Sequence, residues 1–189
     1  MKKGLLFVVS APSGCGKGTI LKEILKNDKF YYSVSATTRS PRINEVDGVN
    51  YHFISKEQFE ENIKNDEMLE YAQYCDNYYG TPKKPVDDNL NNGKHVILEI
   101  EVQGASKIRK LRPDAKFIFI APPSIQELER RLKKRNTENE EVIQKRINQA
   151  KEELPHSIYY DYVVINGELQ NAIEDFKAII RACELENRK

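Results

Sequence analysis

The residues whose types and spacing most clearly predict chemistry form a glycine-rich stretch near the start of the chain. Residues 10–19 read S-A-P-S-G-C-G-K-G-T, between the apolar run Leu5–Val9 and a helical stripe that begins at Ile20. In such a loop successive backbone N–H groups point at one anion, and the following helix directs its positive end there. Lys17 adds a charge for the outer phosphates, so the stretch predicts a nucleotide phosphate loop. The expected contacts come from Ala11, Pro12, Ser13, Gly14, Cys15, Gly16, Lys17, Gly18 and Thr19.

Two positions depart from the usual G-x-x-x-x-G-K-[ST] pattern. Ala11 stands in place of the first glycine, and Gly18 follows Lys17, so that the hydroxyl arrives one place late at Thr19. We therefore expect Mg²⁺ to lie near Thr19 and to be held largely through water. The thiol of Cys15 has two interpretations: the helix terminus lowers its pKa and makes it an oxidation site, or it is simply a small residue that fills the loop.

Two further clusters carry charge suited to phosphate chemistry. Glu99 and Glu101 follow the apolar run Val96–Leu98, at the carboxyl end of a predicted strand, where ligands of open α/β sheets gather. They are expected to orient the molecule that accepts a phosphoryl group or the water around Mg²⁺; the alternative is a pair of surface acids.

Arg39 and Arg42 flank a proline, and two guanidinium groups at this spacing suit a fork that clamps one phosphate. The alternative is a solvated basic turn.

Continuous apolar runs alternate with helical patterns and must position these clusters. The runs read as buried parallel strands, and they are separated by amphipathic stretches, which predicts an α/β fold. Capping signals at Ser55 and Ser124 predict two helix starts. Between 33 and 93, short strands rich in Tyr, Thr and Phe interrupt this alternation and predict an inserted lobe. The predicted strands of the parallel sheet are Leu5–Val9, Val96–Leu98, 117–120 and 163–165.

Composition excludes several classes of protein. The chain has 189 residues and a formal net charge of +1, which argues against binding nucleic acid or a membrane surface through bulk charge. Its longest apolar run, Leu5–Val9, is far below the roughly 20 residues of a membrane span. The three cysteines are odd in number and widely spaced, which fits a reducing, cytoplasmic setting and neither a disulfide framework nor a zinc site.

Over nearly its whole length the chain resembles guanylate kinases of the bacterial type. The resemblance is carried by the phosphate loop and by V-S-A-T-T-R-S-P-R, G-V-N-Y-H-F-I-S, L-E-Y-A-Q-Y, N-Y-Y-G-T-P, L-E-I-E-V-Q-G-A, F-I-F-I-A-P-P-S, E-L-E-R-R-L-K-K-R-N-T-E and I-N-G, in that order. It implies a P-loop core with a parallel sheet, a lobe for the nucleoside monophosphate and a helical lid. The implied boundaries are core 1–32, lobe 33–93, core 94–125, lid 126–154 and core 155–189.

The resemblance also implies the activity and the role of individual residues. The activity is transfer of the terminal phosphoryl group of Mg-ATP to GMP. Arg131, Arg135 and Arg146 of the lid face the ATP phosphates, and Asn166 lies near the adenine, although an ordinary Asn-Gly turn is an alternative. Arg130, Lys133 and Lys134 are interpreted as part of a solvated face. The acceptor phosphate is held by Arg39, Arg42, Tyr51 and Tyr79, and the base is read by Ser35, Glu70 and Thr81.

Guanine chemistry agrees with this assignment. Its ring N–H and exocyclic amine are two donors that one carboxylate, Glu70, accepts together, while the hydroxyls of Ser35 and Thr81 donate to its carbonyl oxygen. Glu101 departs from the family, which usually has Asp there. Lys17, Arg39, Arg135 and Arg146 are the predicted catalytic residues.

Two other functions are alternatives to this one. A non-catalytic binding module of the same fold typically lacks a working phosphate loop, whereas Gly14, Gly16 and Lys17 are present here. A switch GTPase is weakly suggested by the sequence Glu101-x-x-Gly104, but no N-K-x-D base motif occurs. The expected partners are ATP and GMP, with neither nucleic acid nor a membrane, and the chain is either a monomer or a homodimer.

Overall fold

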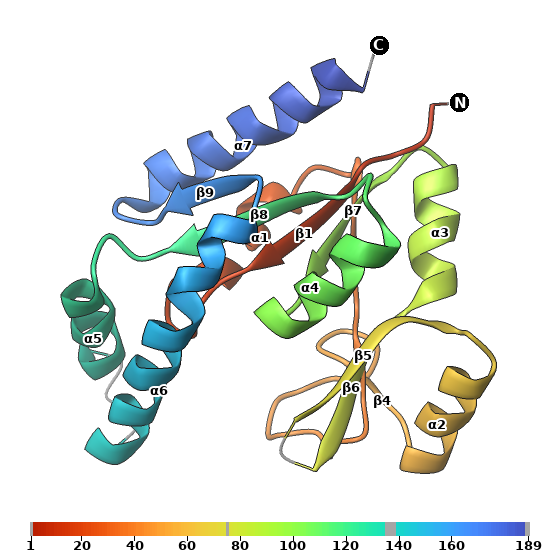
Figure 1. Cartoon of the computed structure of the whole chain (residues 1–189), viewed down its shortest axis with the longest axis horizontal. Helices are drawn as coiled ribbons and strands as arrows, with labels where there is room; N and C mark the ends of the chain where they lie inside the picture. Colours follow the sequence, from red (N-terminus) through yellow and green to blue (C-terminus); the bar gives the residue numbers. More distant parts are fainter. Residues whose placement is uncertain (1, 75, 135–138, 188–189) are drawn as a thin grey trace. The chain divides into compact units, whose positions relative to one another are not determined.

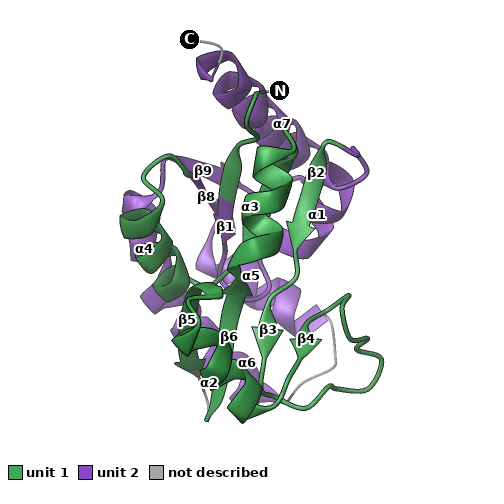
Figure 2. Ribbon diagram, turned by 90° about the vertical axis from the view of Figure 1, so that its right-hand side faces the viewer, with its two compact units in different colours: residues 1–7, 29–115 green, residues 8–28, 116–189 purple. Residues whose placement is uncertain are grey.

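The computed structural model describes residues 2–74, 76–134 and 139–187, which divide into two compact units. Unit 1 consists of residues 1–7 and 29–115, and unit 2 of residues 8–28 and 116–189 (Figure 2). Strand β1 (Leu6–Ser10) begins in the first and ends in the second. No helix in the described ranges is both long and apolar enough to cross a membrane.

Unit 1 contains part of a parallel sheet and a smaller second sheet (Figure 1). The strand order β2-β7-β1 places β7 (His95–Glu99) between β2 (Phe30–Ser33) and the start of β1, and β2 pairs with β7 in parallel from Phe30 opposite His95 to Ser33 opposite Leu98. The second sheet has the order β4-β3-β6-β5. Its strands are β4 (His52–Phe53), β3 (Ala36–Thr37), β6 (Asn77–Pro82) and β5 (Met68–Tyr74), and the helices of this unit are α2 (Lys56–Lys64), α3 (Lys83–Asn91) and α4 (Val102–Leu111).

The small sheet has a core of its own, which explains why this segment forms a separate sheet. Ala36, Phe59 and Met68 are buried together, and the ring of Phe59 stacks on Tyr78 with centroids 5.2 Å apart. Phe59 comes from α2, whose start the sequence predicts correctly: Ser55 Oγ accepts a hydrogen bond of 3.1 Å from the backbone N–H of Gln58. Burial of this aromatic cluster stabilises the strands that carry the predicted acceptor residues.

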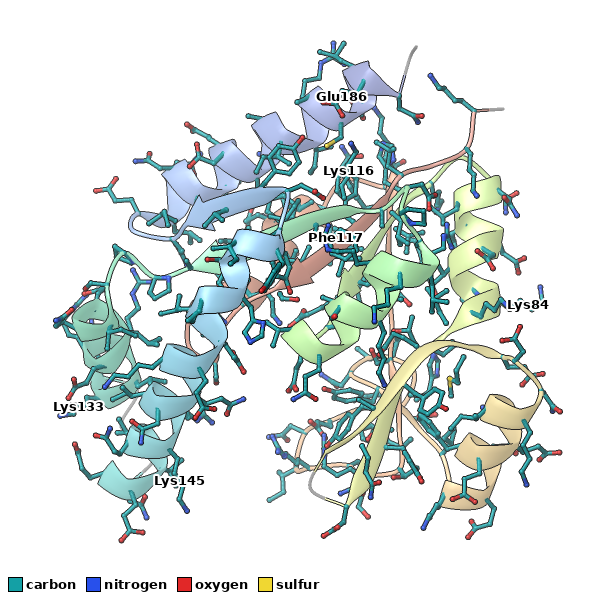
Figure 3. All side chains as sticks on the ribbon, in the orientation of Figure 1. Lys84, Lys116, Phe117, Lys133, Lys145 and Glu186 are labelled. Carbon is teal, nitrogen blue, oxygen red and sulfur yellow. The ribbon has the colours of Figure 1, made fainter. Side chains whose placement is uncertain are left out.

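Unit 2 contains the end of β1, then β8 (Lys116–Ala121) and β9 (Tyr162–Ile165), in the order β1-β8-β9. β8 and β9 pair in parallel, and the salt bridge between Lys116 Nζ and Glu186 (2.9 Å) ties β8 to the C-terminal helix (Figure 3). The helices of this unit are α1 (Lys17–Ile24), α5 (Ile125–Lys134), α6 (Glu140–Glu153), the 3₁₀ helix η1 (Leu154–Tyr159) and α7 (Leu169–Glu186). Parallel strands with intervening helices confirm the predicted α/β class.

Two strands differ from the sequence-based expectation. β2 was not anticipated as a member of the parallel sheet, because its sequence F-Y-Y-S is aromatic and only partly buried. β9 was expected to be buried on both faces, which is wrong: Val164 is buried, whereas Val163 and Ile165 are 46% and 49% exposed. The physical reason is that β9 ends the strand order in its unit, and alternate side chains of a strand point to opposite faces, of which one is open.

Candidate active site

The phosphate loop connects β1 to α1 and adopts the backbone conformation that an anion cradle requires. Gly14 and Gly16 have φ angles of +91° and +82°, in the left-handed region that side chains disfavour. Gly16 is the N-cap residue of α1, and no side chain caps this end of the helix. The first turn of α1 contains no acidic residue either. The N-terminal N–H groups of α1 are therefore in a position to receive an anion.

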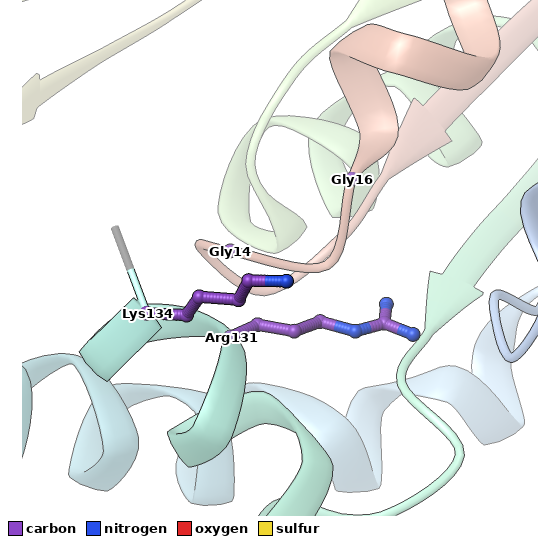
Figure 4. Close-up of a pocket in the computed structure, with 4 residues that line it drawn as sticks. All are labelled: Gly14, Gly16, Arg131 and Lys134. Atoms are coloured by element: carbon purple, nitrogen blue, oxygen red, sulfur yellow. The ribbon is translucent and has the colours of Figure 1, made fainter. Parts of the chain in front are cut away.

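Two side chains of α5 line a pocket of about 230 Å³ together with this loop (Figure 4). The pocket is lined by Gly14, Gly16, Arg131 and Lys134, and in Figure 4 both cationic side chains run alongside the loop. Arg131 is held in place by Glu127, whose Oε1 accepts from its Nε at 2.8 Å, and by the carbonyl of Gly167 at 3.1 Å. A pocket with two cations beside the positive end of α1, which no side chain caps, suits a polyanion such as a nucleotide.

Lys134 is exposed, as its place on a charged helical face predicts, but it also lines this pocket, which the sequence does not indicate. Its exposed neighbour Lys133 (Figure 3) is engaged elsewhere: its Nζ forms ion pairs with Glu129 (2.8 Å) and Glu140 (3.1 Å). Lys134 forms no ion pair with the residues that the structure describes, and it lines the pocket. The helical period could have indicated this position, since Lys134 follows Arg131 by three residues and therefore lies on the same face of the helix.

Two further residues that are predicted to lie at the ATP site contact the loop directly. A guanidinium nitrogen of Arg146 donates to Ser13 Oγ at 3.2 Å, and Asn166 Nδ2 donates to the carbonyl of Cys15 at 2.6 Å. Asn166 is buried, and a Cβ at Gly16 would lie only 2.4 Å from its Nδ2. The end of β9 therefore fixes the shape of the loop through Asn166. Arg135, the third predicted lid arginine, lies outside the described residues.

Cys15 behaves as a residue that fills the loop. Its side chain is 1% exposed, and burial raises the pKa of its thiol to about 12, against the lowering influence of Arg131. At neutral pH such a thiol is protonated and is a poor nucleophile. Of the two interpretations of this cysteine, the structure favours the inert one.

In unit 1 the predicted base-reading residues Glu70 and Thr81 form one buried pair. They lie opposite each other on β5 and β6, and the Thr81 hydroxyl donates to Glu70 Oε1 at 2.8 Å. Glu70 is 7% exposed and Thr81 1%. Burial raises the pKa of Glu70, against the lowering effect of the Thr81 hydrogen bond and of the charge on Lys107. A carboxylate held in this way has limited access to water and strongly favours donors from a ligand.

The predicted phosphate-binding side chains gather around Arg39. Its guanidinium lies over the ring of Tyr51, 5.6 Å from the centroid, and the ring of Tyr79 is 6.0 Å from that of Tyr51. Glu45, which the sequence-based analysis missed, accepts from Arg39 at 3.0 Å and from the backbone N–H of Arg42 at 2.8 Å. Glu45 thus holds the two arginine positions in a fixed relation, while the Arg42 side chain is exposed.

The remaining predicted acceptor residues differ in their surroundings. Glu99, at the end of β7, accepts a hydrogen bond of 3.0 Å from the hydroxyl of Tyr32 on the neighbouring strand β2. Burial, and then the charge on Glu99, raise the pKa of Tyr32, so that this hydroxyl remains a donor. Glu101 is exposed and is the N-cap residue of α4. Ser35 is half-buried, and its carbonyl accepts from His52 N–H at 2.8 Å.

The described site residues therefore form two sets, each within one unit. The donor set consists of the described residues predicted to bind the phosphoryl donor ATP, together with Lys134 from the pocket. It lies in unit 2 and comprises residues 11–19, Arg131, Lys134, Arg146 and Asn166. The acceptor set, in unit 1, comprises Ser35, Arg39, Arg42, Tyr51, Glu70, Tyr79, Thr81, Glu99 and Glu101.

A family model, curated relatives and a solved structure all identify the same family for this chain. A family model described as guanylate kinase matches residues 3–183. A guanylate kinase from Carboxydothermus hydrogenoformans is 51% identical over 190 residues, covering 100% of this chain and 93% of the relative. One from Halalkalibacterium halodurans is 54% identical, covering 96% and 89%. The crystal structure of guanylate kinase from Anaplasma phagocytophilum superposes with a TM-score of 0.78 at 34% identity, covering 96% of this chain and 86% of that chain.

Proposed function

Because the chain belongs to the guanylate kinase family, we propose that its two residue sets divide the substrates, the donor set binding ATP and the acceptor set binding GMP. The family activity is transfer of a phosphoryl group between these nucleotides. Such a transfer asks the protein for position and charge neutralisation more than for covalent chemistry. The assignment of each set to a substrate therefore rests on its charges and its hydrogen-bonding groups.

In the donor set we assign the triphosphate to the loop. Its backbone N–H groups would bind the inner phosphates, and Lys17 would neutralise charge on the outer ones. Arg146 already contacts the loop through Ser13, and Arg131 lines the pocket beside it. We assign both, with Arg135, to the phosphates, where arginines contribute most as charge builds up in the transition state. Lys134 would add a further cation, and Asn166 supports the loop.

The same loop suits Mg²⁺ bound together with ATP. The exposed Thr19 lies in the first turn of α1, and its hydroxyl is the kind of hard oxygen ligand that Mg²⁺ accepts. We propose that Thr19 holds the ion directly or through water, with the phosphates as its other ligands. When bound, the ion neutralises phosphate charge. The protein's own cations, Lys17 and the arginines, orient the phosphate chain.

In the acceptor set we assign the GMP phosphate to the arginine cluster and the base to the buried pair. Arg39, Arg42, Tyr51 and Tyr79 provide the donors for a phosphate monoester. Glu70 accepts from the ring N–H and the exocyclic amine of guanine, and Ser35 donates to the carbonyl oxygen. We assign Glu99 and Glu101 to orienting the acceptor.

For Thr81 we propose a role that differs from the one implied by the resemblance. Its single hydroxyl proton is donated to Glu70 Oε1. While that bond persists, Thr81 orients the carboxylate and does not donate to the guanine carbonyl. The observation that supports guanine selection most strongly is thus a buried, oriented carboxylate in the same unit as the arginine cluster. Adenine would leave that carboxylate without donors, which is how a site rejects an analogue, by about 10⁴-fold in favourable cases.

A coupled assay of the purified chain with Mg-ATP and each nucleoside monophosphate in turn tests this function. Rapid turnover of GMP and little turnover of AMP is the expected result; equal turnover of both, or none of GMP, would contradict it. We also propose a cytoplasmic location, in keeping with Cys15 and Cys183, which are buried and free. The assembly is proposed to be a monomer or a homodimer, which sedimentation would decide.

A further inference from the structure

The backbone of helix α4 lies close to the carboxylate of Glu70 at Gly104. A Cβ built at Gly104 would lie 3.0 Å from Glu70 Oε2, 3.4 Å from Glu70 Cδ and 3.5 Å from Ile100 Cδ1. Contacts of 3.0 Å are closer than carbon and oxygen normally approach without a bond. The space between the helix and the carboxylate therefore suits glycine and is too small for any other residue unless Glu70 moves.

The carboxylate has little freedom to move away. Its other oxygen, Oε1, accepts the Thr81 hydroxyl at 2.8 Å, and the side chain is 7% exposed. A push from α4 must therefore stretch the Thr81 hydrogen bond or turn the plane of the carboxylate. Either change alters the direction of the lone pairs that we assign to guanine.

A second contact from α4 holds the next residue of β5. Lys107 Nζ donates to the carbonyl oxygen of Tyr71, and the same ammonium lies 5.2 Å from the centroid of the Tyr71 ring. Gly104 and Lys107 are three residues apart and therefore share one face of α4. The helix thus contacts β5 at two successive positions, Glu70 and Tyr71.

Glycine in the middle of α4 has no advantage for the helix itself, since it is less favourable there than alanine. Its φ is not in the left-handed region, so backbone conformation does not require it. The close approach to Glu70 is the feature that accounts for it.

We propose that Gly104 is a positioning residue for guanine recognition: by lacking a side chain it lets α4 hold the Glu70 carboxylate in the orientation that accepts two donors, with Lys107 fixing the strand beside it. This inference rests on the proposed role of Glu70 in reading the base. It concerns residues of unit 1 alone and adds α4 to the elements that set specificity.

The test compares kinetic constants for GMP and IMP in the whole enzyme. IMP has the ring N–H and the carbonyl of GMP but lacks the exocyclic amine, so the ratio of kcat/KM for the two measures whether the carboxylate accepts both donors. The variants are Gly104→Ala, Lys107→Met, Glu70→Gln and, as the control, Ser106→Ala, an exposed position on the same helix. Each is also assayed for KM of ATP.

Loss of one hydrogen bond to a charged group corresponds to about a tenfold change. We expect Gly104→Ala to raise KM for GMP and lower the GMP/IMP ratio, each about tenfold, with KM for ATP unchanged and Ser106→Ala like the wild type. Lys107→Met should lower the ratio about threefold.

Three outcomes separate the possible failures. A folded Gly104→Ala variant with wild-type GMP/IMP ratio overturns the inference if Glu70→Gln has lost that ratio. Should Glu70→Gln itself keep the ratio, the proposed role of Glu70 fails first. If Gly104→Ala does not fold, Lys107→Met decides, and an unchanged ratio in that variant overturns the inference.

Discussion

The donor and acceptor sets are built from different parts of the polypeptide. In unit 2 the surface that we assign to ATP is mainly backbone: Gly14 and Gly16 lie in the left-handed region, and no side chain caps the start of α1. In unit 1 the surface that we assign to GMP is mainly side chains, with Glu70 and Thr81 on two strands and Arg39 held by Glu45. Backbone donors recognise a phosphate chain that every nucleoside triphosphate shares, whereas a buried carboxylate distinguishes one base from another.

This difference predicts that substitutions in the two sets will have different signatures. A change in the donor set should impair catalysis with any acceptor, because it removes charge from the transferring phosphates. A change in the base-reading pair of the acceptor set, Glu70 and Thr81, should alter the choice of acceptor.

Lys17→Met should have the largest effect. Removal of the loop's cation should reduce kcat by about 10³-fold or more, since neutralisation of phosphate charge is the main contribution of such a site. A coupled assay measures the rate, and circular dichroism checks that the variant is folded. GMP affinity by calorimetry serves as the control and should stay near the wild-type value; a tenfold loss there would contradict the division into two sets.

Glu70→Gln should reduce kcat/KM for GMP by about 10²-fold, because an amide offers one acceptor oxygen in place of two. KM for ATP should not change. Since burial raises the pKa of Glu70, the fold favours the protonated form, and ionisation at neutral pH opposes folding. The variant should accordingly unfold at no lower temperature than the wild type at pH 7. Wild-type preference for GMP over AMP in this variant would refute the assignment of Glu70.

The pH dependence of GMP binding gives a third, smaller effect. Glu70 must be ionised to accept two donors, and its pKa lies above the usual value. KM for GMP should therefore rise as the pH falls through this raised pKa, and it should level off above it. The GMP phosphate itself titrates at about pH 6, and in Glu70→Gln only that titration should remain, so the difference between the two profiles reports Glu70. A wild-type profile identical to that of the variant would show that another group titrates.

The smallest predicted effect separates two neighbouring lysines. Lys134→Ala should raise KM for ATP about two- to fivefold, as expected for one partly solvated cation, and the increase should diminish at high salt. Lys133→Ala is the matched control, because Lys133 is paired with Glu129 and Glu140. Equal effects of the two substitutions would show that Lys134 is an ordinary solvated lysine with no specific role in ATP binding.

The same contrast explains how much the sequence could predict. The donor loop is ten contiguous residues, so its function follows from local spacing, and the α/β class follows from apolar runs. The pairing of Tyr32 with Glu99 joins residues 67 positions apart, and no local pattern indicates it. The hold of Glu45 on Arg39 and the approach of Gly104 to Glu70 likewise depend on tertiary packing. The open face of β9 required knowledge of strand order.

Direct calorimetry of each nucleotide with Lys17→Met and Glu70→Gln gives the sharpest test of separate donor and acceptor sets. A non-hydrolysable ATP analogue with Mg²⁺ and GMP are titrated separately into both variants and the wild type. We expect a crossed pattern: Lys17→Met binds the ATP analogue more weakly and GMP normally, and Glu70→Gln binds GMP more weakly and the ATP analogue normally. Parallel losses of both ligands in both variants would contradict it.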